Sequence, residues 1–403
     1  MLSKKQLTFV REKLETAQYP IYIHDDDPDG LCSFLLLYKE YLEGQGFMLK
    51  ASPKLDPRFH PKINHLNYDL MVVLDVPEID QEFIDQAKAT LIWIDHHQVQ
   101  DPLNVTYINP RIKDKDAYVP TTRMAYQIVE KKERGIKKYQ EANPNLWIAM
   151  VGCLSDWHMP DFANKFQKIY PDLMEKGDDI GTALFTRPIG TIAKIFAFIY
   201  KGRTKEVYRN IKVSMKINSP YEILNQTTEK GRYLWKMYTK INGAYEAHIK
   251  AAAKRRNESP ILHYNYIDSQ FSFTSTLATE LQFHHKGKVI LITRKSDGKY
   301  KCSIRAQFPI IEQLQTALQG VEGYGGGHPS ACGAVVAEED WDHFLATFTK
   351  ELEETMPKVK EVKKTVKVKE EQKKKKATRK KTTKKKASRT KKNQNTPSSK
   401  NKI

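Results

Sequence analysis

Hydrophobic residues in the first half of the chain fall into short runs separated by amphipathic stretches. Residues 21–23, 70–74 and 91–94 are strand-like runs, and the last two are continuously apolar, as expected for strands covered on both faces. Helical patterns lie between them, over residues 31–42 and 79–89. Because strands that alternate with helices build parallel sheets, the pattern predicts an α/β fold with a parallel sheet in the N-terminal domain.

The second half of the chain has a different pattern. Residues 145–253 are mostly helical in pattern, and a long charged and aromatic helix is predicted over residues 229–256. Beyond residue 260 strand-like segments return, at residues 289–293, 301–305 and 334–336. The Ser-Asp-Gly-Lys sequence at residues 296–299 is typical of a hairpin turn. We therefore expect a helical linker followed by a smaller α/β C-terminal domain.

Basic residues are concentrated at the C-terminal end. Residues 358–403 contain 21 Lys and Arg against three Glu, so +18 of the formal net charge of +19 lies there. This Lys-rich segment has too few apolar residues to bury the surface that would offset its chain entropy. We expect four segments, namely a larger domain at 1–200, a linker at 201–257, a second domain at 258–356 and a disordered basic tail at 357–403.

Cysteine usage and hydropathy exclude several classes of protein. The four cysteines form no CxxC pair and have apolar or small neighbours, which indicates buried thiols in a reducing compartment and excludes a disulfide framework or zinc site. No signal-peptide pattern is present at the N-terminus. The most apolar helical stretch, at 189–200, is shorter than the roughly 20 residues that span a bilayer. We expect a cytoplasmic protein with no membrane partner.

Acidic and imidazole side chains follow three of the predicted strands. These residues are Asp25, Asp27 and Asp29, then Asp75, then Asp95, His96 and His97. Each group alone is typical of a solvated turn or a strand end. However, the carboxyl ends of parallel strands share one edge, so these side chains should gather there. Carboxylates this close repel one another unless cations neutralise them, and mixed carboxylate and imidazole ligands suit Mn²⁺, with Mg²⁺, Co²⁺ or Fe²⁺ as alternatives.

These motifs resemble, in order and spacing, those of the DHH family of phosphoesterases. The matching segments are Asp27-Pro28-Asp29-Gly30, Asp75, Asp95-His96-His97 and Asp156 in Val-Gly-Cys-Leu-Ser-Asp. A late Gly-Gly-Gly-His-Pro-Ser-Ala-Cys-Gly run at 325–333 is similar to the motif of the DHH-associated C-terminal domain. The resemblance covers about residues 18–345. It implies that 1–200 is a catalytic domain and that 258–356 binds substrate.

The resemblance implies a role for each matched metal ligand. Asp75 would bridge two divalent ions. Asp27 would bind one of these ions, and Asp29, His96 and Asp156 would bind the other. This arrangement predicts a centre of two divalent metal ions, with Mn²⁺ favoured and Mg²⁺ or Co²⁺ as alternatives.

Other residues of the same motifs have different implied roles. His97 would face the scissile phosphate, and Asp95 would orient the imidazoles from behind. Many relatives place a His two residues before the first Asp of the motif. This chain has Asp25 there, with His24 beside it. We therefore expect Asp25 to join the first metal site and to make it richer in oxygen ligands.

The resemblance also implies substrate contacts in the second domain. Arg305, at a predicted strand end, matches an arginine that grips substrate phosphate. Gly325, Gly326 and Gly327 form a glycine run that exposes backbone N–H groups and lets a phosphate or base approach closely, as a loop would. His328 follows them as a predicted substrate contact.

Four further residues have weaker functional interpretations. Asn109 and Arg111 follow the Asp-His-His motif, but a structural turn explains them better. Tyr324 and Phe308 have rings that stack on bases in nucleic-acid-binding sites, although a position in the core is the commoner fate of such residues.

The predicted function is that of a RecJ-like exonuclease. Such an enzyme hydrolyses single-stranded DNA or RNA with water activated between two divalent ions, and DNA repair or docking on replication and repair proteins is compatible with it. The Lys-rich tail favours a polymeric substrate.

Three alternatives fit the same motifs. A nanoRNase or cyclic-dinucleotide phosphodiesterase acts on very short substrates. An inactive replication scaffold is disfavoured because all the metal ligands are retained. An inorganic pyrophosphatase is disfavoured by the Gly-Gly-Gly-His motif, which that class typically lacks.

Overall fold

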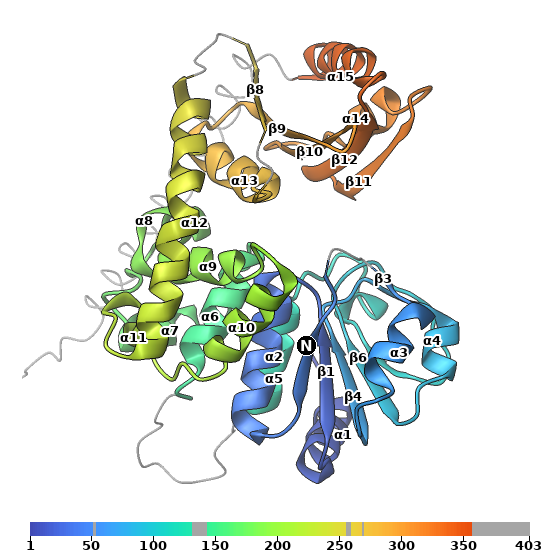
Figure 1. Ribbon diagram of the computed structural model, residues 1–403, viewed down its shortest axis with the longest axis vertical. Helices are drawn as coiled ribbons and strands as arrows, with labels where there is room; N and C mark the ends of the chain where they lie inside the picture. Colours follow the sequence, from blue (N-terminus) through green and yellow to red (C-terminus); the bar gives the residue numbers. More distant parts are fainter. Residues whose placement is uncertain (51–53, 131–142, 255–258, 268–269, 357–403) are drawn as a thin grey trace, which may run out of the picture. The chain divides into compact units, whose positions relative to one another are not determined.

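A computed structural model of the protein describes residues 1–50, 54–130, 143–254, 259–267 and 270–356 (Figure 1). The chain divides into two compact units. The first unit comprises Met1–Ala251 and Asp268–Phe273, and the second comprises Ala252–Ile267 and the residues from Thr274 onward. The predicted tail and its expected disorder lie outside the described residues.

The first unit is built on a five-stranded parallel sheet, as the sequence predicted. The strand order is β2-β1-β4-β6-β7, with bounds Gln45–Met48, Pro20–His24, Leu70–Leu74, Thr90–Ile94 and Thr106–Ile108. The last residues of the three middle strands, His24, Leu74 and Ile94, lie in one row. The chain therefore leaves these three strands at the same edge of the sheet.

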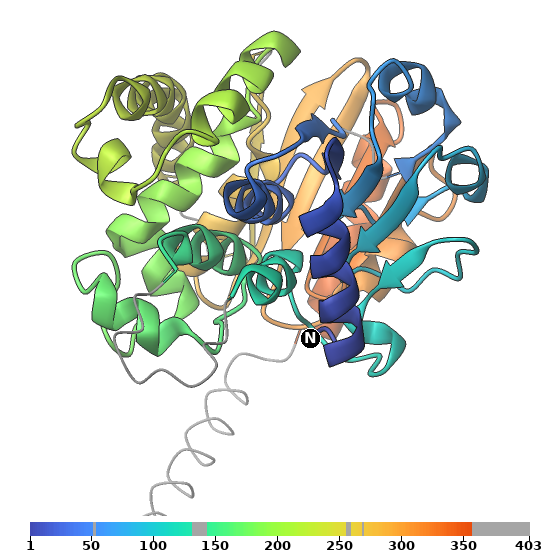
Figure 2. The same ribbon diagram turned by 90° about the horizontal axis from the view of Figure 1, so that it is seen from below.

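Helices cover both faces of this sheet. On one face Tyr22, Val72 and Ile92 pack against helices α2, α5 and α6, with bounds Pro28–Tyr41, Thr121–Val129 and Leu146–Ser155. On the other face Ile21 and Trp93 pack against α3 and α4, with bounds His60–Ile63 and Gln81–Asp85. Helix α1, Lys4–Thr16, lies beside α5 (Figure 2). Burial on both faces explains the continuous apolar runs.

The remaining elements of the first unit are mostly helices. These helices are α7 Ala163–Ile169, α8 Ile180–Thr186, α9 Pro188–Ile199, α10 Thr204–Ser214, α11 Pro220–Leu224 and α12 Glu229–Lys254, whose last three residues belong to the second unit. Two short strands and two 3-10 turns complete it, β3 Lys54–Leu55, β5 Glu78–Ile79, η1 Pro57–Phe59 and η2 Pro110–Ile112. Among the described residues no single helix is long and apolar enough to cross a membrane. The bent pair α8 and α9 passes that test on length and composition together, with an angle of 76° between its halves.

One predicted helix is shorter than its pattern. The helix expected over 79–89 is limited to Gln81–Asp85, because Ile79 pairs with Leu55 in a small parallel sheet. Phe83 and Ile84 are buried and anchor the remaining turn under the main sheet. The chain must then reach the start of β6 at Thr90, which leaves no room for further helix.

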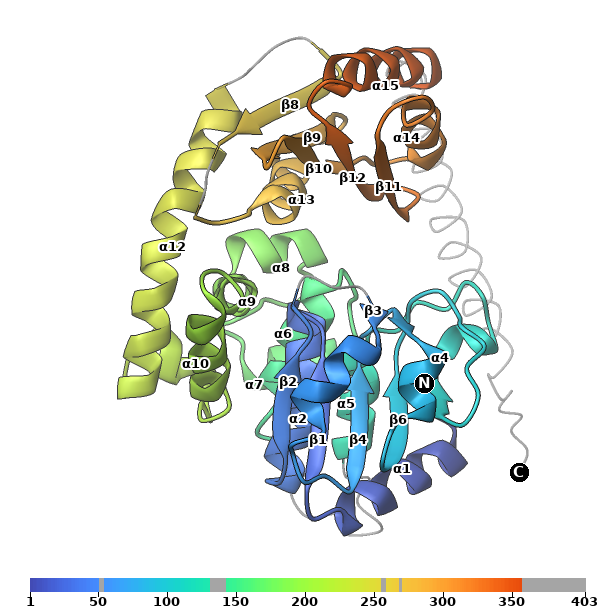
Figure 3. The ribbon, with the colours of Figure 1, turned by 45° about the vertical axis from the view of Figure 1, so that its right-hand side comes forward.

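The second unit is a mixed sheet with helices on both faces, as predicted for a smaller α/β domain. The strand order is β11-β12-β10-β9-β8, with bounds Gly323–His328, Ala331–Ala337, Lys299–Arg305, Val289–Ser296 and Ile261–Tyr266. The β8–β9 pair is parallel and the others are antiparallel. Helices α14 and α15 cover one face and α13 lies on the other (Figure 3), with bounds Ile311–Ala317, Trp341–Thr355 and Thr274–His284. Asp297 and Gly298 both have positive φ and form the predicted hairpin turn.

Candidate metal centre

The register of the parallel sheet places three aspartates together. Asp25, Asp75 and Asp95 each follow the last residue of a middle strand, and those last residues are direct neighbours. Asp75 has φ +61, a left-handed backbone that aspartate tolerates better than most residues. Its N–H donates to the carbonyl oxygen of Ile94 at 3.0 Å. The sheet thus holds a strained turn at the residue predicted to bridge two ions.

The acidic loop after β1 is fixed by the start of α2. Asp27 caps this helix, since its carboxylate accepts the N–H groups of Asp29 at 2.7 Å and Gly30 at 3.1 Å. Pro28 occupies the first helical turn, where it loses no hydrogen bond. A Cβ atom at Gly30 would lie 2.0 Å from the Asp25 carboxylate, so the glycine leaves the space into which Asp25 leans.

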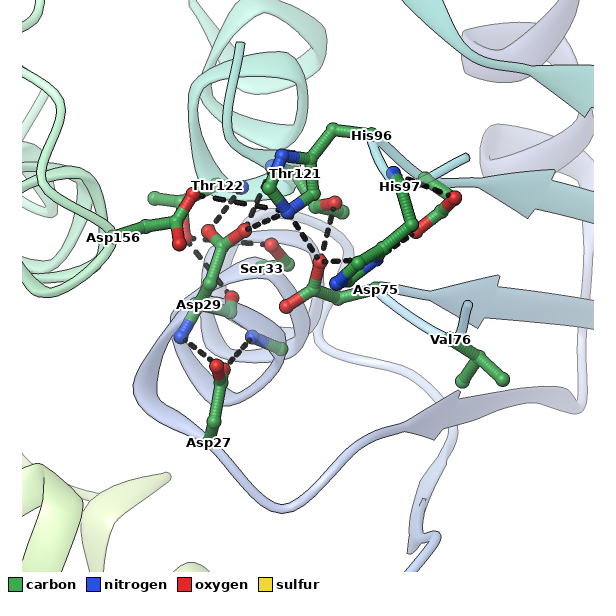
Figure 4. A network of polar contacts seen from close by, with 12 residues as sticks. Asp27, Asp29, Ser33, Asp75, Val76, His96, His97, Thr121, Thr122 and Asp156 are labelled. Atoms are coloured by element: carbon green, nitrogen blue, oxygen red, sulfur yellow. Dashed lines mark hydrogen bonds and ion pairs between the residues drawn. The ribbon is translucent and has the colours of Figure 1, made fainter. Parts of the chain in front are cut away.

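Asp29 is held by a second helix. It is buried, and its two carboxylate oxygens accept the N–H groups of Thr121 at 2.9 Å and Thr122 at 2.8 Å, at the start of α5 (Figure 4). The Thr121 hydroxyl donates to Asp75 at 3.0 Å. Burial and the charges of Asp75 and Asp156 nevertheless raise the pKa of Asp29 well above its ordinary value, because they outweigh these N–H groups. Neither threonine was predicted from the sequence, because neither belongs to one of the recognised motifs.

His96 lies at the middle of the cluster. Its Nε2 atom is 3.3 Å from an Asp75 oxygen, 3.7 Å from Asp156 and 4.0 Å from Asp29 (Figure 4). Asp75 and His96 follow strands β4 and β6, Asp29 lies in the first turn of α2, and Asp156 lies at the end of α6. One imidazole nitrogen thus faces three carboxylates at distances that a single cation bridges.

Among the described residues, three groups of side chains have ligand atoms within 4.8 Å of one another. The groups are Asp25, Asp27 and Asp75, then Asp29, His96 and Asp156, then Asp75, His96 and His97. Asp75 belongs to two of them, and the first is made only of carboxylates. The structure therefore brings together every predicted metal ligand, including Asp25 in the position where many relatives have His.

The cluster fits divalent cations on its own chemistry. Oxygens of Asp25 and Asp156 are buried without a hydrogen-bond partner in the described part of the chain, a costly state for carboxylates that a cation relieves. Burial, together with the charge of Asp75, raises the pKa of Asp27 to about 8. Burial also raises the pKa of Asp156 to about 6, against the opposing charge of His96. The centre is thus short of positive charge.

The contact between Asp75 and His96 shifts the pKa values of the two residues in opposite directions. Burial alone would raise the pKa of Asp75 and lower that of His96. The hydrogen bond and the attraction between them outweigh burial, so the pKa of Asp75 is lowered and that of His96 is raised to about 10. A protonated His96 must lose its proton before it binds a metal, so metal binding here should release protons.

His97 is oriented by a buried carboxylate. Its Nδ1 atom lies 2.7 Å from one oxygen of Asp95, and its main-chain N–H donates to the other at 2.9 Å. Asn109 donates to Asp95 at 3.3 Å and accepts the N–H of Arg111 at 2.9 Å, which supports the structural interpretation of both. Burial would lower the pKa of His97, but Asp95 and Asp75 raise it. Asp95 is absent from the ligand groups found among the described residues.

His24 does not join these ligand groups. It is fully buried, its ring stacks on Phe34 with centroids 5.3 Å apart, and its Nδ1 lies 2.7 Å from the main-chain oxygen of Asp25. Burial lowers its pKa to about 4, so the imidazole is neutral at physiological pH. Within the described residues His24 therefore supports the loop from behind.

The predicted substrate contacts of the second unit share one face of its sheet. Arg305 lies opposite Ala331, and Ala331 lies opposite His328, so the three form one row across β10, β12 and β11. Neighbouring strands are about 4.8 Å apart, which puts Arg305 and His328 about 10 Å apart across a small residue. Arg305 donates to the hydroxyls of Ser275 at 3.0 Å and Thr279 at 3.3 Å and to main-chain oxygens, and in the part of the chain described none of its hydrogen-bond partners is a carboxylate. Such an uncompensated guanidinium is suited to an anion.

The glycine run differs from its predicted loop form. Gly325, Gly326 and Gly327 lie in β11, an exposed edge strand. A Cβ atom on Gly325 or Gly327 would clash with main-chain oxygens of β12, so these two glycines allow strand pairing. A Cβ atom on Gly326 would meet nothing within 4 Å, and this residue shares the face of His328.

The two aromatic candidates of this unit have different fates. Tyr324 is 70% exposed on β11, so its predicted position in the core is wrong. Tyr324 alternates with Gly326 and His328 along the strand, so its ring lies on the exposed face that these residues share. Phe308 packs against the hydrophobic core of the second unit, as expected.

Known families and structures match the chain along most of its length. The model of the DHH family N-terminal domain matches residues 20–153, and that of the DHHA1 domain matches residues 268–354. No curated protein sequence matches significantly.

Three solved structures illustrate the similarity. RecJ from Thermus thermophilus in complex with Mn²⁺ has a TM-score of 0.61 at 14% identity, with 86% of this chain and 53% of that chain covered. Exonuclease RecJ bound to manganese has a TM-score of 0.56 at 13% identity, covering 87% and 95%. The DHH domain of a member of a ribosomal-protein family has a TM-score of 0.60 at 15% identity, covering 86% and 89%.

These similarities establish fold and family. At such identities a structural match shows the fold alone, and the chain spans about half the length of the Thermus thermophilus RecJ that it matches. Both domain models nevertheless match in the order that the motifs predicted. The chain belongs to the DHH family of phosphoesterases, with a DHH domain followed by a DHHA1 domain.

Proposed function

We propose that this protein is a metal-dependent exonuclease that hydrolyses single-stranded DNA or RNA. The observation that carries the proposal is the pair of ligand groups, Asp25 with Asp27 and Asp29 with His96 and Asp156, which adjoin the common carboxylate of Asp75. Structures with the same fold include a RecJ exonuclease bound to manganese and a RecJ in complex with Mg²⁺. That likeness supports a nuclease of the same kind.

The residues of the centre fit two divalent ions. Asp25, Asp27 and Asp75 would hold one ion through oxygen alone, and Asp29, His96 and Asp156 would hold the other. Carboxylates suit Mg²⁺ and Mn²⁺ while imidazole favours later transition metals, so Mn²⁺ is the ion that suits both groups best, with Mg²⁺ or Co²⁺ next. Two such ions would lower the pKa of a bound water and so supply hydroxide for attack on phosphorus at neutral pH.

His97 would contact the substrate phosphate, and Asp95 would hold the His97 ring in position. The contact between His97 Nδ1 and Asp95 fixes the ring and leaves Nε2 free to donate to a phosphate oxygen. Burial lowers the pKa of His97, but Asp95 and Asp75 outweigh burial and raise it, which favours a charged imidazole and a stronger hydrogen bond in the transition state. His97 is therefore the proposed catalytic residue, and Asp95 positions it.

The second unit would bind the nucleic acid. Arg305 and His328 border a face on which Gly326 and Ala331 present almost no side chain, so a sugar-phosphate backbone has room between them. We propose residues 1–200 as the catalytic domain, 201–257 as the linker and 258–356 as the substrate domain. The basic residues of 358–403 would add affinity for long strands.

The cellular setting belongs to the same proposal. The four free cysteines are all buried, as in proteins of reducing compartments, which favours the cytoplasm. A nuclease that acts on single strands there would serve DNA repair and would meet replication or repair proteins.

The test is hydrolysis of end-labelled single strands. Purified protein with Mn²⁺ is given a DNA 20-mer, an RNA 20-mer and a dinucleotide, and the products are resolved by length. Stepwise shortening of a 20-mer supports the exonuclease, whereas turnover of the dinucleotide alone would assign the short-substrate class. Asp75→Asn should lower the rate at least about a thousandfold, while the exposed control Asp342→Asn should not change it. More than a tenth of the activity in Asp75→Asn would contradict the shared-ligand assignment.

A further inference from the structure

Two exposed aromatic side chains adjoin the metal ligand Asp156. Trp157, the next residue, is 43% exposed and Tyr118 is 41% exposed. The Tyr118 hydroxyl donates to the main-chain oxygen of Asp156 at 2.8 Å. Its ring stands edge-on to that of His96, with centroids 5.4 Å apart. Large aromatic surfaces that remain exposed beside a site are available to a ligand.

The backbone of Trp157 is in a conformation that bulky residues avoid. Helix α6 ends in a Schellman motif, in which the N–H of His158 donates to Cys153 at 2.9 Å and that of Trp157 donates to Leu154 at 3.0 Å. The motif needs a left-handed residue directly after the cap, and glycine is its usual occupant. Trp157 takes this place with φ +52. A large side chain at a glycine position is a genuine outlier.

Trp157 also lies directly beside the metal ligand Asp156. Its Cα atom is one peptide, about 3.8 Å, from that of Asp156. The Tyr118 hydrogen bond holds the carbonyl of that same peptide. Phe185 on α8 approaches the indole with centroids 6.3 Å apart, which limits its movement on that side. Because glycine would form this turn with less strain, a tryptophan at this position indicates that its side chain has a functional role.

We propose that Trp157 is a nucleobase-stacking residue of the metal centre, supported by Tyr118. This inference rests on the proposed function and deepens it by adding a contact to the base beside the scissile phosphate. An indole face stacks on any base, so the contact would favour nucleotides over other phosphodiesters without reading their sequence. It would also hold the terminal nucleotide while the phosphate meets the ligands.

The test compares normal and abasic substrates. Single-stranded 6-mers are made with all bases present, or with a tetrahydrofuran abasic residue at the 5′ end or at the 3′ end. Stacking of one base should give wild-type protein roughly a 5- to 150-fold higher kcat/KM on the normal strand at the end that is digested. Trp157→Gly should bring that ratio close to one, mainly through KM, and Trp157→Phe should retain most of it.

Two further measurements separate stacking from a structural role. Because glycine suits the left-handed position, the melting temperature of Trp157→Gly should equal or exceed that of wild type. Trp157→Leu keeps apolar bulk without an aromatic face and should also lose the preference. Tyr19→Ala removes a 54% exposed aromatic residue before the opposite end of β1 and should change nothing.

The outcomes distinguish this inference from the proposed function. If wild type with Mn²⁺ cleaves no oligonucleotide, the exonuclease proposal fails. The stacking contact is then decided by fluorescence anisotropy of the labelled 6-mers in the Asp75→Asn background, with and without Trp157→Gly. A base preference unchanged by Trp157→Gly, or a clear loss of thermal stability in that variant, would overturn the role of Trp157.

Discussion

Without divalent ions, the free energy of unfolding of the protein should fall as the pH rises from about 5 to 8. The folded chain keeps a proton on Asp27 up to a pKa of about 8, whereas an unfolded aspartate loses it near pH 3.9. Across that window the folded state binds more protons than the unfolded state. Stability therefore falls with rising pH, by about 1.4 kcal/mol per pH unit for a full proton. His96, raised to about 10, contributes in the same direction above pH 6.5.

The measurable effect is smaller than this limit. Asp27 is partly exposed, and solvent screening should reduce the slope to about half, near 0.7 kcal/mol per pH unit. For a chain of this size that corresponds to a fall of about 1 °C in melting temperature per pH unit. With Mn²⁺ the carboxylates are held in their charged form, so the stabilisation by Mn²⁺ should grow with pH.

The assay is thermal unfolding at pH 5, 6, 7 and 8, in chelator and in saturating Mn²⁺. Asp27→Asn is the matched variant, because asparagine still caps α2 but cannot titrate. Its slope in chelator should be flatter than that of wild type. A melting temperature in chelator that stays level or rises between pH 5 and 8 would refute the reasoning about the carboxylate cluster.

Three other predictions follow from the same features. Thr121→Val removes the hydroxyl that donates to Asp75 and should raise the Mn²⁺ dissociation constant about tenfold by calorimetry, while unchanged affinity would exclude a supporting role. Arg305→Ala and His328→Ala should each raise KM for a single strand and leave Mn²⁺ binding near wild type, and loss of metal binding in a folded variant would contradict the division between the units. Deletion of 358–403 should leave cleavage of a short oligonucleotide unchanged and flatten the salt dependence of binding to long strands by roughly 0.7 per lost phosphate contact. Equal salt slopes for both forms would remove the basic segment from nucleic-acid binding.

The sheet and the acidic edge were predictable because both depend on short-range patterns. Apolar runs at 70–74 and 91–94 specify buried parallel strands, and the residues that follow each run must leave at one edge. The placement of Asp25, Asp75 and the Asp-His-His motif follows from that rule alone. The family resemblance added Asp156, which lies far along the chain at the end of a helix.

What the sequence did not predict depends on contacts between distant segments. Thr121 and Thr122 meet Asp29 across 92 and 93 positions, and threonines that start a helix are too common to signal such a role. The glycine run became strand β11 because β12 supplies a partner, which outweighs the low strand preference of glycine. The left-handed backbone of Trp157 has no sequence signal, since glycine is expected there.

The contact between Asp29 and α5 has a consequence for how activity is inferred from residues. Asp29 satisfies two N–H groups of a buried helix start, so the fold needs this carboxylate even in a chain that has lost its metals. Asp25 makes no such contribution, because one of its buried oxygens lacks a hydrogen-bond partner among the described residues. A descendant released from catalysis would keep Asp29 and be free to lose Asp25. Among sequences of this fold, a metal ligand at the position of Asp25, whether Asp or the His of many relatives, is therefore the more informative marker of a working enzyme.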